Sequence, residues 1–228
     1  MPQSKPKVRR PRLPEVDEHR AAFDLDGLER IPRDFFDRDP REVGPELLGK
    51  VLVRHEGDKL LAGRIVEAEA YLGVDDAAAH SAAGRTERNA VLFGPPGFAY
   101  VYLIYGNHYC LNVSCLPEND AGCVLIRALE PLAGMEEMAR TRGVKLRGAR
   151  DLRLLCSGPG RLTQAMGITR PRDNGKDFLD SGSDLQLLDD GFSPERVAST
   201  ARVGITKAAH HLFRYVIAGN EFVSGKRG

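Results

Sequence analysis

Two glutamates and a tyrosine alternate along one short run of the chain, GRIVEAEAYLG. If the run from about Gly63 to Leu72 is a strand, successive side chains point to opposite faces, and Glu67, Glu69 and Tyr71 share one face. That face is either a solvated surface that carries glutamates or one wall of a cleft in which a carboxylate acts as a base. Periodicity alone does not choose between the two glutamates.

A second chemical feature is a concentration of aromatic rings. The chain has no Trp, yet ten residues contain four tyrosines: Tyr100, Tyr102, Tyr105 and Tyr109. Two β-rich runs, 98–105 and 109–115, flank a Gly-Asn pair, and this pattern predicts a β-hairpin. The rings could pack across the strands. Alternatively they could stack on nucleic-acid bases, with a tyrosine at the tip wedged into a base stack.

Basic residues gather in three segments. The loop HSAAGRTERN is either an ordinary connection or a set of phosphate contacts. A cluster from Arg140 to Arg153 is also explained by a solvated helix and loop. The first 14 residues contain five Lys or Arg and no acid, which is typical of a disordered arm, either solubilising or DNA-contacting. We therefore divide the chain into a basic arm, 1–20, and one folded domain, 21–228.

Composition narrows the class of protein further. With 228 residues, 42% hydrophobic and 29% charged, the chain is predicted to form a soluble globular domain. A polar, basic N-terminus argues against a signal peptide, and no apolar run approaches the ~20 residues of a membrane helix. Because the net charge is only +1, any binding to DNA would require a local patch of basic residues. Four cysteines without a C-x-x-C pair indicate buried, reduced thiols and a cytoplasmic protein rather than a metal site.

The elements that must position these residues are mostly strands. Helices are expected at 41–48, 134–143 and 161–166, and strands at 50–54, 63–72, 122–130, 184–191 and 201–206 besides the hairpin. Pro131 is expected to end the strand that precedes it. Strands in runs, with helices at intervals, favour an antiparallel α+β domain over βαβ winding.

Taken together, these motifs closely resemble the alkyladenine (3-methyladenine) DNA glycosylase family. The resemblance is carried by GRIVEAEAYLGVDDAAAHSAAGRTERN, YVYLIYGNHYCLNVSC and VLIRALEP, and it continues through LCSGPGRLTQAMGI and RVGIT to FVS. It implies a single α+β domain on a curved antiparallel β-sheet, with flanking helices. A protruding β-hairpin is expected to insert into the minor groove of DNA.

The resemblance also implies a catalytic centre. Glu69 matches the general base that activates water, Arg127 matches a residue that helps to hold this water, and the carbonyl of Val223 is its third contact. Tyr71 and His80 match the residues that sandwich the extruded base.

Further residues are implied around this centre. Tyr102 closes the pocket from another side, and Asn112 disfavours the 2-amino group of normal guanine. Tyr105 matches the hairpin residue that fills the gap left by the flipped nucleotide. The remaining expected DNA contacts are Arg85, Arg88 and Asn107.

The implied activity is that of a monofunctional DNA glycosylase of base excision repair. It would flip alkylated or deaminated purines (3-methyladenine, 7-methylguanine, hypoxanthine or ethenoadenine) out of double-stranded DNA and hydrolyse the N-glycosidic bond. No lysine lies between Arg64 and Arg127, which favours direct attack by water and an intact abasic site as the product. No cofactor or metal is implied, and we expect a monomer in the cytoplasm, at the nucleoid. A non-catalytic damaged-DNA-binding protein and a small-molecule nucleosidase are the alternatives.

Overall fold

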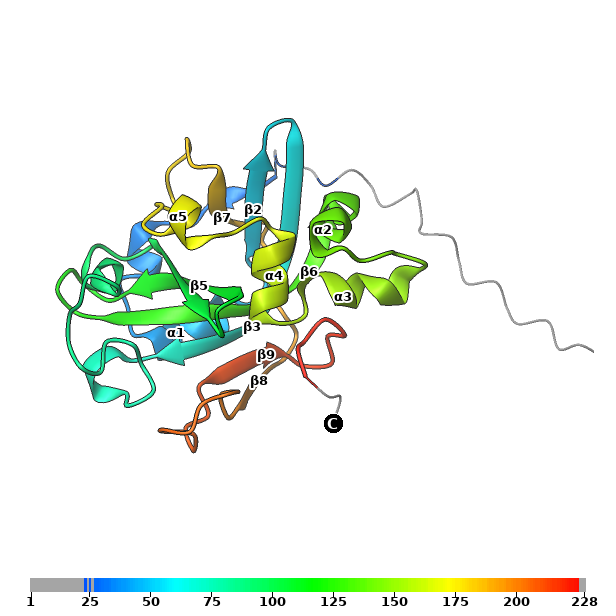
Figure 1. The fold of residues 1–228 in the computed structure, drawn as a ribbon. Helices are drawn as coiled ribbons and strands as arrows, with labels where there is room; N and C mark the ends of the chain where they lie inside the picture. The colour runs from blue at the N-terminus through cyan, green and yellow to red at the C-terminus, as the bar shows by residue number, and fades with distance from the viewer. Residues whose placement is uncertain (1–22, 24, 26, 226–228) are drawn as a thin grey trace, which may run out of the picture.

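The computed structural model describes residues 23, 25 and 27–225 (Figure 1). The basic arm expected over residues 1–20 lies outside this described part. Within it, nine strands form one open antiparallel sheet, and short helices flank it. The expectation of an antiparallel α+β fold is confirmed.

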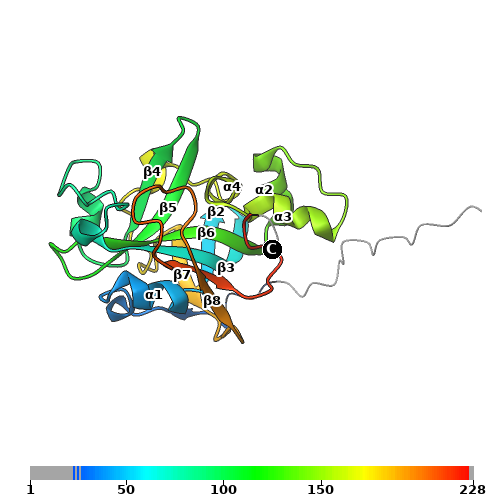
Figure 2. The ribbon, with the colours of Figure 1, turned by 90° about the horizontal axis from the view of Figure 1, so that it is seen from below.

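The sheet has the order β1-β7-β2-β3-β6-β5-β4, with β9 added beside β3 and β8 beside β9. Its strands are β1 (Glu29–Arg30), β2 (Val51–Glu56), β3 (Lys59–Tyr71), β4 (Ala99–Ile104), β5 (His108–Cys115), β6 (Gly122–Ala133), β7 (Leu185–Asp189), β8 (Val197–Thr200) and β9 (Arg214–Ile217). The predicted hairpin is β4–β5, and Figure 2 shows it extending beyond the rest of the sheet.

Helices cover both faces of the sheet. They are α1 (Pro40–Glu46), α2 (Met135–Arg142), α3 (Arg153–Cys156), α4 (Pro159–Ala165) and α5 (Arg170–Asp173). In Figures 1 and 2, α1 lies on one side of β3 and β6, and α2, α3 and α4 lie on the other. Local sequence explains their ends: Asp39 caps α1 by accepting a hydrogen bond from Arg41 N, and α2 stops at Gly143 in the left-handed conformation.

The central strand β3 is buried for most of its length because it has neighbours on both edges. It pairs with β6 along its length and also with β9 at Glu67–Glu69, with register shifts around these residues. The two glutamates are therefore inside the protein, each with 0% exposure. The interpretation of a solvated glutamate face is wrong for this strand.

Two predictions about strands need correction. β6 does not end before Pro131 but continues to Ala133, because Pro131 stands at a register shift opposite Gly63, where a missing N–H is tolerated. The segment 201–206 is not a strand: Val203 N donates to the Glu69 side chain instead of to a neighbouring strand, and the Arg202 side chain donates to the Ala70 carbonyl of β3. All four cysteines are buried and free, as predicted.

No helix in the described ranges is long and apolar enough to cross a membrane.

Candidate active site

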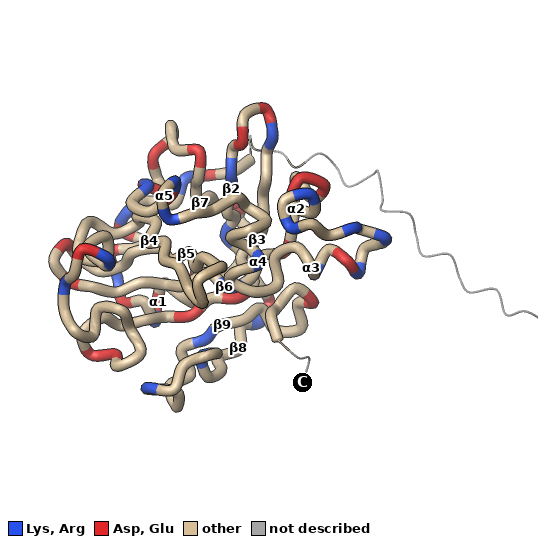
Figure 3. Tube along the Cα trace, viewed as in Figure 1, with Lys and Arg blue, Asp and Glu red and all other residues tan. Residues whose placement is uncertain are grey.

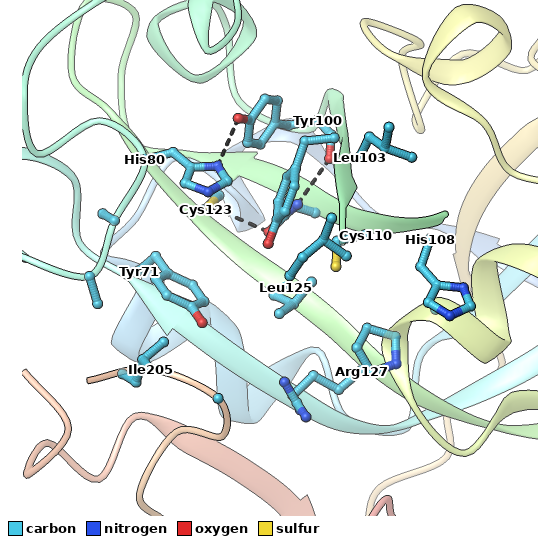
Figure 4. Close-up of a pocket in the computed structure, with 18 of the residues that line it drawn as sticks. Tyr71, His80, Tyr100, Leu103, His108, Cys110, Cys123, Leu125, Arg127 and Ile205 are labelled. Atoms are coloured by element: carbon cyan, nitrogen blue, oxygen red, sulfur yellow. Dashed lines mark hydrogen bonds between the residues drawn. The ribbon is translucent and has the colours of Figure 1, made fainter. Parts of the chain in front are cut away.

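A cavity of about 400 Å³ opens between the β4–β5 hairpin, the C-terminal end of β3 and the segment 203–205 (Figure 4). The tertiary structure brings most of the predicted site residues to it. Those that line it are Tyr71, His80, Arg88, Tyr102, Tyr105, Asn112 and Arg127. These side chains come from β3, β4, β5, β6 and two loops, so the cavity exists only in the folded chain.

Glu69 lies in the wall of this cavity, behind residues that line it. One carboxylate oxygen, Oε2, accepts hydrogen bonds from the Tyr71 hydroxyl at 3.0 Å and from Arg127 Nη1 at 3.2 Å. The other, Oε1, accepts one from the backbone N–H of Val203 at 2.7 Å. Because Tyr71, Arg127 and Val203 all line the cavity, the carboxylate is held close to it and in a fixed orientation.

Glu67 belongs to a different cluster that shares one partner with Glu69. Its Oε1 accepts from Arg127 Nε at 2.8 Å and Arg214 Nε at 2.7 Å, and its Oε2 accepts from Ser224 N at 2.6 Å. Burial alone would raise the pKa of Glu67, but the charge of Arg127 and the bond to Arg214 outweigh it and hold this pKa below its usual value. Glu67 is therefore ionised, both of its carboxylate oxygens have donors, and its hydrogen bond to Arg127 orients that side chain.

The aromatic rings of His80, Tyr100 and Tyr102 line one side of the cavity, and Figure 4 shows His80 and Tyr100 there. His80 Nδ1 lies 2.9 Å from the Tyr100 hydroxyl, and the His80 ring packs edge-on against Tyr102 with ring centroids 4.3 Å apart. Desolvation beside these rings, together with the charge of Arg88, lowers the pKa of His80, which favours the neutral ring at pH 7. Burial raises the pKa of Tyr100 to about 12 and that of Tyr102 also upward, so both hydroxyls stay protonated.

Tyr71 faces these rings from the end of β3, on the left side of Figure 4. Burial and the neighbouring Glu69 raise its pKa, so its hydroxyl stays a hydrogen-bond donor to that carboxylate. The chain turns sharply after Tyr71 at Gly73, which has φ +83° and approaches Ala121 so closely that any Cβ would lie 1.7 Å from its carbonyl oxygen. This turn directs the following loop, and His80 with it, back over the cavity.

Asn112 forms part of the cavity and is almost fully buried, at 2% exposure. It stands opposite Tyr100 in the hairpin register and donates from Nδ2 to the Tyr100 carbonyl at 3.0 Å. Its Oδ1 accepts from Cys123 Sγ at 3.8 Å. Bonds at both ends of the amide therefore fix its orientation.

The hairpin tip presents Tyr105 to solvent at the mouth of the cavity. Its side chain is 81% exposed and its φ is +54°, a conformation that non-glycine residues rarely adopt. Gly106 and Asn107 complete the turn, with Asn107 N donating to Ile104 O at 3.4 Å. From Phe98 to Cys115 the chain contains no Lys, Arg, Asp or Glu, so the hairpin is tan in Figure 3, the colour of residues without charge.

The two arginines of the loop differ in position. Arg88 lies 5.8 Å from the Tyr102 ring centroid and lines the cavity, whereas Arg85 is exposed on the loop and does not reach it.

Val223 is not brought to this site. Its carbonyl accepts from Arg153 Nη2 at 3.5 Å, and the residue lines a separate hollow with Arg153 and Arg214. The turn that carries it is tied to Glu67 through Ser224, not to Glu69. The backbone beside Glu69 is that of Val203, in the RVGIT motif, whose residue pattern had predicted a strand.

Comparison with known proteins identifies the family of this chain. The family model described as methylpurine-DNA glycosylase matches residues 34–221. A relative from Koribacter versatilis is 64% identical over 88% of this chain and 95% of its own length. Relatives from Burkholderia lata (47% identical, 86% of this chain, 91% of its own) and Chlorobium phaeobacteroides (45%, 87% and 98%) are also similar. All three are provisionally named 3-methyladenine DNA glycosylases.

The family model and these relatives identify the protein as an enzyme of the DNA glycosylase class, which acts on DNA in base excision repair. The chain belongs to the methylpurine-DNA glycosylase family.

Proposed function

We propose that this enzyme releases alkylated or deaminated purines from double-stranded DNA, with 3-methyladenine, 7-methylguanine, hypoxanthine and ethenoadenine as substrates. The observation that carries the proposal is the buried Glu69 carboxylate, fixed by Tyr71, Arg127 and Val203 at the wall of an aromatic cavity. The relatives' names support 3-methyladenine among these substrates.

In this proposal the damaged nucleotide rotates out of the duplex, and its base enters between Tyr71 and His80 against Tyr102. The π faces of these rings favour an electron-poor, alkylated purine. Asn112, fixed by Tyr100 and Cys123, excludes the 2-amino group of undamaged guanine.

The reaction is hydrolysis of the N-glycosidic bond through an oxocarbenium-like transition state. Water adds to the sugar carbon, its proton passes to Glu69, and the base leaves with the electron pair of the broken bond. Arg127 helps to orient the water. The Val223 carbonyl, expected as the third contact of the water, lies in a separate hollow. Val203 contributes a different interaction: its backbone N–H donates to the Glu69 carboxylate. The product is a free base and an intact abasic site.

DNA contacts are assigned to the surface around the cavity mouth. Tyr105, exposed at an uncharged tip, fills the space that the flipped nucleotide leaves. Arg88, Arg85 and Asn107 contact the backbone or groove beside it. The enzyme acts as a monomer at the nucleoid in the cytoplasm.

A base-release assay on duplexes that each carry one lesion tests the proposal. Release of the four purines, retained in the presence of a chelator and without borohydride trapping of protein on DNA, is the expected result. Binding without release would indicate a damaged-DNA-binding protein instead. Activity on free nucleosides but not on duplexes would indicate a nucleosidase.

A further inference from the structure

A fully buried arginine lies directly behind the aromatic cavity. The side chain of Arg202 has 0% exposure and pairs with Asp76, whose side chain is 1% exposed. Both carboxylate oxygens of Asp76 receive hydrogen bonds from the guanidinium, and Arg202 Nη1 also donates to the Ala70 carbonyl at 2.9 Å. Burying such a pair carries a desolvation penalty that apolar residues would avoid, so its stability contribution does not explain it.

The guanidinium is placed against the cavity's lower ring. It lies 4.6 Å from the centroid of Tyr71 and 5.4 Å from that of Phe213. Tyr71 lines the cavity and Arg202 does not, so the Tyr71 ring separates the cation from the cavity. A base stacked on the exposed face of Tyr71 therefore has a positive charge behind that ring.

The same ion pair is also tied to the other parts of the site. Val203, the next residue, donates its backbone N–H to Glu69. Asp76 accepts from Leu72 N at 3.3 Å and from Ala78 N at 3.1 Å, which organises the loop that leads to His80. The ion pair therefore adjoins Tyr71, Val203 and the loop that carries His80.

We propose that Arg202, with Asp76, is a positioning residue that sets lesion specificity, an inference that rests on the proposed function of the cavity. It holds Tyr71 and Val203 in place for every substrate. In addition, the positive charge of Arg202 attracts the π electrons of the Tyr71 ring, which leaves the other face of the ring less attractive to a cationic base. The same charge repels a cationic base stacked on that face. Arg202 thus shifts the preference of the enzyme toward neutral lesions such as hypoxanthine and away from cationic ones such as 7-methylguanine.

Single-turnover base release from two otherwise identical duplexes, one with each lesion, tests this. In Arg202→Met both rates should fall, but the ratio of 7-methylguanine to hypoxanthine release should rise about 2- to 5-fold, the range of one modest cation–π contact. Arg202→Lys keeps the charge, so both rates should fall while the ratio stays near that of the wild type. Asp76→Asn leaves the cation without its counter-charge, so the ratio should move in the opposite direction.

A matched control is Arg54→Met, which removes another fully buried arginine, paired with the buried Asp173 and absent from the cavity lining. It should lower the melting temperature without changing the ratio. Equal losses on both lesions in Arg202→Met, or a shift of Asp76→Asn in the same direction, would overturn the inference while the proposed function stands. A wild-type enzyme that releases neither base would overturn both. Asp76→Asn and Arg202→Lys both retain a cation at position 202, and the amide oxygen introduced by Asp76→Asn can still accept from it, so these two variants test the inference independently of Arg202→Met.

Discussion

The clearest test of the mechanism is to neutralise each of the two buried glutamates in turn. Glu69→Gln keeps the volume of the side chain and removes the proton acceptor beside the cavity. Its amide oxygen can still accept from Val203 N, but the amide nitrogen then faces Arg127 Nη1, so one donor meets another. Loss of a general base lowers the rate by ~10² to 10⁴, and 10² corresponds to about 2.7 kcal/mol of transition-state stabilisation.

Glu67→Gln should lower the stability of the fold more than the rate of base release. It removes a buried charge that faces the guanidinium of the buried Arg127 and that of the partly buried Arg214. Breaking a buried ion pair by removing one partner costs ~3–5 kcal/mol of folding free energy. At roughly 2–4 °C per kcal/mol for a chain of this size, the melting temperature should fall by roughly 6–20 °C. The carboxylate of Glu69 remains, so the rate per folded molecule should fall less than the ~10² expected for a lost base.

The assay is single-turnover release of hypoxanthine, with enzyme in excess at a temperature where both variants are folded, alongside thermal melting. We expect Glu69→Gln to bind lesion DNA but release the base at least ~10²-fold more slowly, and Glu67→Gln to be the less stable variant. Near-normal release by Glu69→Gln, or a slower chemical step in Glu67→Gln than in Glu69→Gln, would refute the assignment of the base.

Three further outcomes follow from the described contacts. Tyr105→Ala should slow release from well-paired lesions more than from mismatched ones, which are easier to extrude, and should leave the melting temperature unchanged because the ring is 81% exposed. Asn112→Ser shortens the amide that Tyr100 holds, so the ratio of guanine to hypoxanthine release should rise; an unchanged ratio would exclude this role. Burial opposes ionisation of Asp184, but bonds to Lys176 and Arg172 lower its pKa from 3.8 to about 2. Because the pKa of Asp184 is lower in the folded than in the unfolded chain, its carboxylate stabilises the fold at pH values above the unfolded-state pKa. This contribution is lost as the pH falls from about 3.8 to about 2. The melting temperature of Asp184→Asn should therefore fall less than that of the wild type across this pH range.

The sequence predicted several elements correctly because alternation, β-rich composition and turn glycines lie within the elements themselves. Alternation and β-rich composition located β3 and the β4–β5 hairpin, and a Gly-Asn pair located its tip. Helix α2 ends at Gly143, as its glycine predicts. The segment 201–206 was mistaken for a strand because its apolar residues resemble one, while the bonds of Arg202 and Val203 are made to residues more than a hundred positions away.

The sequence by itself determined the residue types of the site, the hairpin that carries Tyr105 and, through its motifs, the family. It could not distinguish Glu67 from Glu69 by periodicity, since both side chains project from the same strand. Only the tertiary structure separated them: of the three residues that enclose Glu67, only Arg127 lines the cavity, whereas all three residues bonded to Glu69 line it. The same holds for the backbone around the site: Val203, and not Val223, lies beside Glu69. Backbone contacts to a buried carboxylate depend on how distant segments fold together, so they leave no periodic pattern in the chain.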